Sequence, residues 1–152
     1  MGMKFRDTKN LTEIKGTLFY EKEEFSLNTE PFYENGFSSL LINDIQLEID
    51  EDSVLLYIWG FCPLQQAKEI DSFPSYYETR QISVLTETPL IAGISKRINH
   101  ARWDIFYNKA NDWICIGNPK LSGQHLIQFA PGAIATIENQ EIIALWLHPI
   151  FH

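Results

Sequence analysis

The sequence predicts a single, mainly β domain with antiparallel strands, arranged as a sandwich or a barrel, with one or two short helices. Apolar and polar side chains alternate over residues 45–50, which is the period of a half-buried strand. A polar turn at 51–53 and an apolar stretch at 54–59 complete a first hairpin. Residues 133–138 and 141–147 predict a second hairpin. No linker or repeat divides the 152 residues, so we expect one domain spanning 1–152.

The remaining strands are predicted from residues that favour extended structure. Segments rich in aromatic and β-branched residues lie at 79–85, 103–107, 113–116 and 126–129, with weaker candidates at 18–20 and 25–27. Residues 108–112 form a turn between two of these strands. The strand at 54–59 is apolar on both faces, which predicts a central strand covered on both sides.

The C-terminal hairpin has a specific predicted register. A two-residue loop at Asn139 and Gln140 pairs Ile137 with Ile142, Ala135 with Ala144, and Ala133 with Trp146. Residue 140 is not the glycine that the tightest turns prefer, and Glu138 faces Glu141 in this register. These two features favour a loop that is one or two residues longer.

Two short helices are expected. Pro63 suits the first position of a helix over residues 64–70. Thr88 and Pro89 suit the start of another that continues through Ile98, with Leu90, Ile91, Ile94 and Ile98 on one face. Gly93 lies inside this second segment and weakens it by about 1 kcal/mol relative to alanine.

The net charge of −8 is concentrated in the first third of the chain. Residues 1–52 hold 12 acidic and 5 basic side chains, whereas residues 53–152 hold 8 and 7. We expect no nucleic-acid partner, because the chain lacks the basic surface that displaces counterions from phosphates. We expect no membrane partner, because no apolar run reaches the roughly 18–20 residues of a membrane span. The polar N-terminus lacks a secretion signal, so a cytoplasmic location is expected.

The segments YIWGFCP and DWICIGNP resemble each other and contain both cysteines. Cys115 lies in an apolar strand, and Cys62 has no basic neighbour closer in sequence than Lys68, so both are predicted to be buried and inert. Trp59 and Trp113 are expected to be buried, so that replacement by alanine costs about 3–5 kcal/mol, whereas a near-zero cost would mark an exposed ring and a candidate contact residue. The two segments are therefore interpreted as strands that each end at a glycine before a proline-marked turn.

Candidate catalytic and metal-binding residues are absent from the pattern. His148 and His152 are four residues apart, but Pro149 disfavours the helix that would align them, and His148 is expected to bond to backbone. No phosphate-binding glycine loop or nucleophile motif occurs. We therefore expect no metal, no cofactor and no catalytic residue, and the sequence favours a non-enzymatic role.

Two hypotheses for function remain. The first is a non-catalytic protein-interaction domain, immunity- or inhibitor-like, whose acidic residues bind a basic partner. Its binding residues are Glu23, Glu24, Glu48, Asp50, Glu51 and Asp52, with neighbouring aromatic side chains. The alternative is a small-ligand or enzymatic β domain with an aromatic-lined pocket that holds an anionic group on Arg97, His100 and Arg102. A flat acidic face with exposed aromatics favours the first, and a deep pocket favours the second. The oligomeric state is left open.

Overall fold

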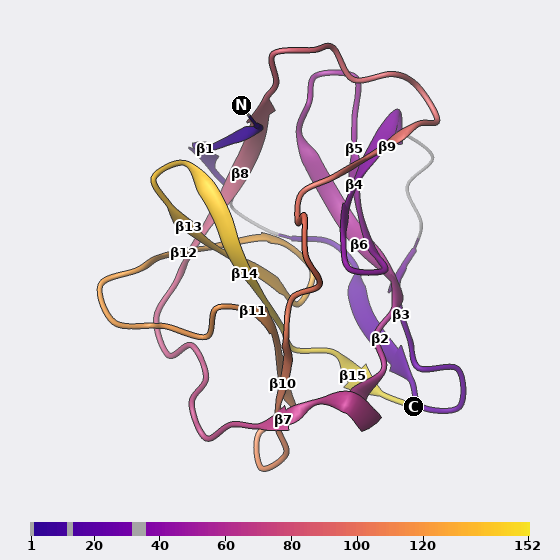
Figure 1. The fold of residues 1–152 in the computed structure, drawn as a ribbon, viewed down its shortest axis with the longest axis vertical. Helices are drawn as coiled ribbons and strands as arrows, with labels where there is room; N and C mark the ends of the chain where they lie inside the picture. The colour runs from indigo at the N-terminus through magenta and orange to yellow at the C-terminus, as the bar shows by residue number, and fades with distance from the viewer. Residues whose placement is uncertain (1, 12–13, 32–35) are drawn as a thin grey trace.

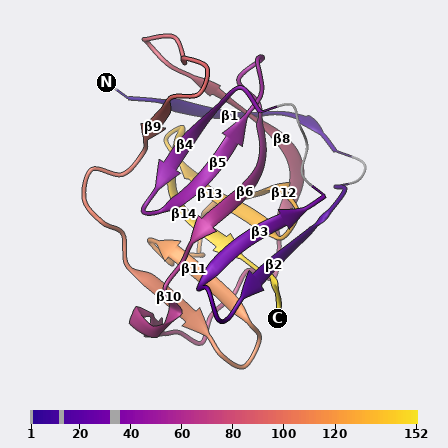
Figure 2. The same cartoon turned by 90° about the vertical axis from the view of Figure 1, so that its right-hand side faces the viewer.

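The computed structural model describes residues 2–11, 14–31 and 36–152 and contains two β-sheets packed face to face (Figures 1 and 2). One sheet has eight strands, in the order β1 (Lys4–Asn10), β8 (Glu78–Leu85), β12 (His125–Ala130), β13 (Ala133–Glu138), β14 (Glu141–Leu147), β11 (Trp113–Gly117), β10 (Ile105–Asn108) and β7 (Lys68–Glu69). The other has seven, in the order β15 (Ile150–Phe151), β2 (Thr17–Glu21), β3 (Ser26–Glu30), β6 (Leu55–Phe61), β5 (Ile45–Ile49), β4 (Ser38–Ile42) and β9 (Ser95–Arg97). The prediction of a mainly β fold is confirmed, and the two layers make it a sandwich.

Both sheets are mixed. Among the described strands, nine pairings are antiparallel and four are parallel. The parallel partners are β8 with β12, β4 with β9, β2 with β15 and β10 with β7. Each of these joins segments that are far apart in the sequence, so local patterns do not reveal them.

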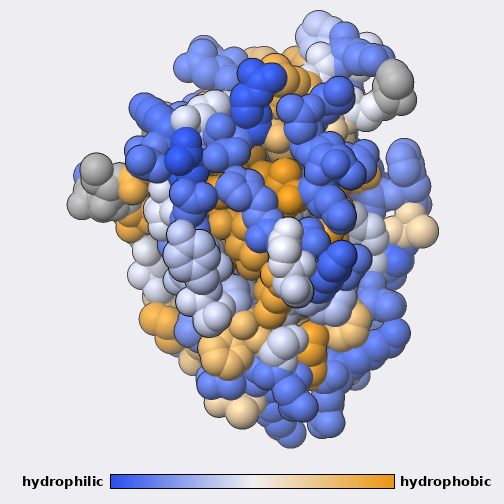
Figure 3. Space-filling view, turned by 90° about the vertical axis from the view of Figure 1, so that its left-hand side faces the viewer, coloured by the Kyte–Doolittle hydropathy of each residue, from blue (hydrophilic) through white to orange (hydrophobic). Residues whose placement is uncertain are grey.

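The main core lies between the sheets. Along each strand, side chains that point into the core alternate with side chains that point outward. The core contains Leu27, Leu47 and Ile58 from one sheet and Ile82 and Ile127 from the other. A smaller apolar cluster lies on the outer face of the eight-stranded sheet and contains Trp113, Cys115, Leu126, Ile134, Ala144 and Trp146. Figure 3 shows the molecule from this sheet's side, with a central strip of apolar side chains between hydrophilic ones.

The two sheets are joined directly at one corner. Val54 forms an isolated bridge with Ser83, and the Ser53 carbonyl accepts a hydrogen bond of 2.8 Å from the Val84 N–H. The chain also passes from β14 through Pro149 into β15, which pairs with β2 in the opposite sheet. The layers are therefore held by backbone hydrogen bonds as well as by the core.

The first hairpin is confirmed. Strands β5 and β6 pair antiparallel, and the Asp50 carboxylate accepts hydrogen bonds from the backbone N–H groups of Asp52 and Val54 at 2.8 and 3.0 Å. A bulge at Leu56 interrupts the ladder, because Ile49 pairs with Leu55 whereas Glu48 pairs with Tyr57. Asp50 thus has a structural role in closing the turn.

The second hairpin is confirmed in part. Its loop has two residues, Asn139 and Gln140, both with positive φ (53° and 64°), so the expectation of a longer loop is wrong. Ile137 pairs with Ile142 as predicted. A bulge at Ile143 then shifts the register, so that Thr136 faces Ala144, Ala135 faces Leu145 and Ala133 faces Leu147. The predicted pairs Ala135–Ala144 and Ala133–Trp146 are wrong for this reason.

Both helix predictions are wrong beyond one turn. Over 64–70 the chain forms a single 3-10 turn, η1 (Leu64–Gln66), and then β7, which pairs with β10. One turn fixes several dihedrals for few hydrogen bonds, and η1 has no side-chain cap to extend it. Among the described residues, no helix has the length and apolar character needed to cross a lipid bilayer.

The segment 88–98 is a loop that ends in β9. Gly93 has φ of 75°, the Ile94 N–H bonds to the Ile91 carbonyl as in a turn, and β9 pairs in parallel with β4. Leu90 and Ile98 pack against the main core, but Ile91 and Ile94 are 59% and 56% exposed, so the four residues do not form the single buried face that the helix prediction required.

The two cysteine-containing segments resemble each other because each needs a glycine at the same kind of backbone position. Gly60 and Gly117 both adopt positive φ, at 138° and 111°. A Cβ at Gly60 would collide with the Asp44 carbonyl, and a Cβ at Gly117 with the Ile143 carbonyl. Each glycine therefore lets a neighbouring backbone approach closely, which no larger residue permits.

Replacing Gly117 with alanine should destabilise the fold far more than replacing Gly93. Both glycines have positive φ, but nothing lies within 4 Å of a Cβ at Gly93. We expect Gly93→Ala to cost about 1–2 kcal/mol from backbone strain alone, and Gly117→Ala to cost about 3–5 kcal/mol because overpacking adds to the strain. Urea unfolding measures both, and equal losses would contradict the close approach.

Candidate functional site

The predicted acidic residues lie at two ends of the seven-stranded sheet. Glu23 and Glu24 are exposed in the turn between β2 and β3, and Glu51 and Asp52 are exposed in the turn between β5 and β6. Ser26 at the start of β3 pairs with Phe61 at the end of β6, so these two turns lie at opposite ends of β6. The six predicted acidic residues therefore do not form one patch.

Aromatic side chains are exposed on the outer face of this sheet. Phe25, Trp59 and Phe61 are 36%, 37% and 44% exposed, and the predicted burial of Trp59 is wrong. Trp59 faces Gln46 across the ladder, and Phe61 faces Ser26, so both aromatic side chains point away from the core. The rings of Phe25 and Phe61 meet edge to face with centroids 6.4 Å apart.

Glu48 belongs to the same face. It lies on β5, and its Oε2 accepts a hydrogen bond of 2.9 Å from the Trp59 indole Nε1. We call the surface formed by Glu23, Glu24, Phe25, Glu48, Trp59 and Phe61 the aromatic–acidic face. Figure 2 views the sheet from this outer side. The surface combines partly exposed rings with carboxylates, as the first hypothesis expects.

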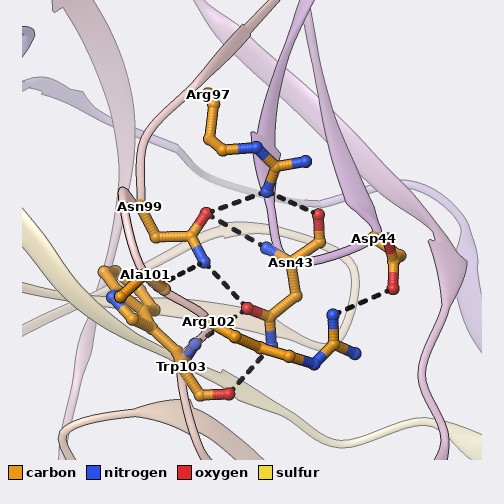
Figure 4. Close-up of polar contacts among 7 residues, drawn as sticks. All are labelled: Asn43, Asp44, Arg97, Asn99, Ala101, Arg102 and Trp103. Carbon is orange, nitrogen blue, oxygen red and sulfur yellow. Dashed lines mark hydrogen bonds and ion pairs between the residues drawn. The ribbon is translucent and has the colours of Figure 1, made fainter.

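The structure brings Arg97, His100 and Arg102 beside the β4–β5 turn, as Figure 4 shows for the two arginines. Arg97 donates from Nη1 to the Asn43 carbonyl at 2.9 Å and to Asn99 Oδ1 at 3.2 Å. Arg102 forms an ion pair with Asp44, at 3.2 Å between Nη1 and Oδ2. The positive charge of Arg102 is therefore partly compensated within the protein.

A buried amide pair fixes this region. Asn43 and Asn99 are both 3% exposed, and Asn99 Nδ2 donates to Asn43 Oδ1 at 2.8 Å. Asn43 also accepts from the Trp103 N–H at 2.9 Å and donates to the Trp103 carbonyl at 3.0 Å, while Asn99 donates to the Ala101 carbonyl at 3.1 Å (Figure 4). Buried polar groups satisfied in this way hold residues 97–103 in one arrangement.

A groove of about 890 Å³ lies beside this segment. Its walls come from β1, the loop after β8, residues 96–104, the end of β11 and the start of β14. An adjoining hollow of about 200 Å³ lies at the β4–β5 turn and shares Arg97, Asn99, His100 and Arg102 with the groove. The three residues of the alternative hypothesis thus line a concave surface.

Both cysteines are free and buried, as predicted. Burial raises the pKa of the Cys62 thiol to about 12, although the charge of Arg102 lowers it slightly, and burial also raises the pKa of Cys115 well above its usual range. A thiol with a raised pKa carries little thiolate at neutral pH. Neither cysteine has the environment of a nucleophile.

The histidines are used in local contacts. His148 Nε2 lies 3.1 Å from the Asn111 carbonyl, which confirms the expected backbone bond, and its ring stacks on Trp113 with centroids 4.3 Å apart. His152 Nδ1 lies 3.1 Å from Glu21 Oε1. Within residues 2–11, 14–31 and 36–152, no three His, Cys, Asp or Glu side chains converge as a metal site requires.

No protein-family model matches the sequence, and no curated protein is similar enough to count as a relative.

The two tryptophans of the similar segments should differ in their contribution to stability. Trp113 is 7% exposed and packs edge to face with Trp146 at 6.4 Å, whereas Trp59 is 37% exposed. We expect Trp113→Ala to lower the free energy of unfolding by about 3–5 kcal/mol, and Trp59→Ala by no more than about 1 kcal/mol. Chemical denaturation of the two variants tests this, and a large loss for Trp59→Ala would remove that residue from the candidate surface.

The buried thiols should resist modification and make the fold sensitive to alkali. At pH 8, a thiol reagent should react slowly with the folded protein and rapidly with two equivalents after unfolding. Burial also raises the pKa of Tyr20 to about 12, and its hydroxyl donates to the Cys62 carbonyl at 2.7 Å. Groups with raised acid pKa values stabilise the fold below their unfolded pKa, here about 9 to 10. That stability is lost as the pH rises towards 12.

Urea unfolding at pH 8, 10 and 11.5 measures the alkaline loss. Tyr20→Phe should weaken the dependence on pH above 10, because one of the titrating groups is removed. Rapid labelling of either cysteine in the folded protein at pH 8 would contradict the burial argument and reopen an enzymatic role.

Proposed function

We propose that this protein binds a basic protein partner through the aromatic–acidic face and catalyses no reaction. The observation that carries the proposal is the exposure of Phe25, Trp59 and Phe61 on one face of the seven-stranded sheet beside Glu48. Exposed aromatic side chains clustered among polar residues are characteristic of interaction surfaces. An inhibitor or immunity protein for a basic enzyme or toxin is one concrete form of this role.

The aromatic and acidic residues have different tasks in such an interface. Trp59 and Phe61 are large, rigid anchors whose burial against a partner supplies most of the binding energy. Glu23 and Glu24 lie in the exposed turn next to Phe25 and attract a basic surface during encounter. The hydrogen bond from Trp59 orients Glu48, so its carboxylate is held in place before a partner arrives.

Three of the six predicted acidic residues lie outside this face. Asp50 closes its own turn, and Glu51 and Asp52 are at the opposite end of β6. At most, these three residues attract a basic partner from a distance, and salt at 0.1 M screens this attraction beyond about 10 Å. Glu51 and Asp52 therefore provide a control pair for Glu23 and Glu24, because both pairs are exposed and carry the same charge.

Binding kinetics with a partner captured from the native organism test the proposal. We expect the association rate to fall about tenfold or more between low salt and about 0.5 M, since steering is screened. The double variant Glu23→Lys/Glu24→Lys should slow association strongly, and Glu51→Lys/Asp52→Lys should slow it less. Trp59→Ala and Phe61→Ala should each weaken binding about 30-fold, mainly through faster dissociation.

Specific results would contradict the proposal. These are an acidic partner, equal effects of the two charge-reversal variants, or unchanged affinity in both aromatic variants. Circular dichroism of each variant confirms that the fold is retained.

A further inference from the structure

The groove beside the paired amides has apolar walls. Met3, just before β1, and Phe5 of β1 lie on one side. Ile98 and Trp103, from the segment 98–104 that crosses between the sheets, lie on another, and Ile142 and Ile143 at the bulge of β14 on a third. The Ile143 carbonyl accepts a hydrogen bond of 3.0 Å from the Asn118 N–H, which holds the bulge against the end of β11. The volume of about 890 Å³ lies within the range of about 300–1,000 Å³ that is usual for small-molecule sites.

The basic side chains that line the groove differ in their partners. Arg102 pairs with Asp44, and Lys96 donates from Nζ to the Thr88 hydroxyl at 2.6 Å and to the Thr88 carbonyl at 3.4 Å. Within the part of the chain that the structure describes, no carboxylate lies within ion-pair distance of Arg97, whose bonds go to two neutral oxygens through Nη1 alone. These bonds leave Nη2 and Nε available. Arg97 thus presents a positioned but uncompensated guanidinium where the groove meets the smaller hollow.

The other end of the groove holds two glutamates and the Lys96 ammonium, which is bonded to Thr88. Glu141 follows Gln140, whose carbonyl accepts the Phe5 N–H at 2.8 Å, and Glu87 follows β8, where Leu85 pairs with Lys4. Both glutamates are therefore beside β1, away from the β4–β5 turn that binds Arg97. Two carboxylates against one ammonium leave this end with a net negative charge, so a second anionic group on a ligand would be repelled there.

We propose that this groove binds a small molecule with an apolar body and a single carboxylate, and that the carboxylate binds to Arg97. The site is separate from the aromatic–acidic face and does not depend on the protein-binding role. Of the three residues in the alternative hypothesis, Arg97 is the anchor. Arg102 is occupied by Asp44, and His100 lies at the rim beside the two arginines.

Three eight-carbon probes separate the parts of this proposal: octanoate, 1-octanol and octanedioate. Octanol has the apolar chain without the charge, and octanedioate adds a second carboxylate at the far end. Titration of the ¹⁵N-labelled protein at pH 7, followed by amide chemical shifts, gives both the affinity and the location. Octanoate should shift the amides of Asn99, Gly117 and Asn118, which line the groove, and bind about tenfold more tightly than either other probe, as one charge-assisted bond predicts.

The variants Arg97→Gln and Arg6→Gln complete the test. Each removes one exposed arginine charge, but Arg6 lies on β1 outside the groove lining. Arg97→Gln should reduce octanoate affinity to that of octanol, and Arg6→Gln should leave the preference intact. Equal binding of octanoate and octanol by the unaltered protein, shifts confined to other surfaces, or a preference that persists in folded Arg97→Gln would overturn the proposal.

Discussion

The hydrogen bonds between Asn43 and Asn99 fix the segment of residues 98–104, which crosses from one sheet to the other beside the groove. Residues 98–104 leave β9 in the seven-stranded sheet and enter β10 in the other, so they have no regular ladder. Backbone groups buried on such a path need other partners. The two amides supply them at Ala101 and Trp103. Removing either amide would leave several buried polar atoms unpaired, at a cost of about 1–3 kcal/mol for each.

The same constraint explains why a groove persists. If the crossing segment were free to collapse, Ile98 and Trp103 could close onto β14 and fill the space with side chains. The amide pair ties the segment to the β4–β5 turn instead. Gly117 donates its N–H to the Asp104 carbonyl at 3.0 Å and lets both the Ile143 carbonyl and the Trp103 ring approach closely. The walls of the concave surface are therefore positioned by the paired amides and by the close contacts at Gly117.

Strand positions could be predicted from the sequence, but the direction of several side chains could not. Leu55 and Ile58 both face the core because Leu56 is an extra, bulged residue between them. Without the bulge, alternation from Leu55 would have placed Tyr57 and Trp59 inside. Because every residue of 54–59 is apolar or aromatic, the pattern does not show which alternate side chains face the core. The exposure of Trp59, which is central to the candidate face, therefore could not be predicted. The bulge at Ile143 caused the corresponding error in the second hairpin.

Strands β4 and β9 were missed for a different reason. Ser38 and Ser39 are polar yet buried, because Ser38 Oγ donates to the Ile94 carbonyl at 2.7 Å and Ser39 Oγ lies 2.6 Å from Ser95 Oγ. Their partners are 56 residues away, so the local sequence resembles that of a loop.

The charge pattern of the sequence had a similar limit. It identified an acidic third of the chain, but only the antiparallel pairing of β3 and β6 shows that its two exposed turns lie at opposite ends of a sheet.

The β4–β5 turn contacts both candidate surfaces. Its Asn43 carbonyl binds Arg97 at the groove, and its Asp44 carbonyl accepts the Phe61 N–H at 3.2 Å next to the aromatic–acidic face. Shared contact alone does not couple two sites, because coupling requires an element with two arrangements that each ligand biases differently. Here the buried amides and the close approach at Gly60 hold the turn in one arrangement. A carboxylate in the groove and a protein on the outer face would therefore bind independently, each using a surface that the same rigid turn positions.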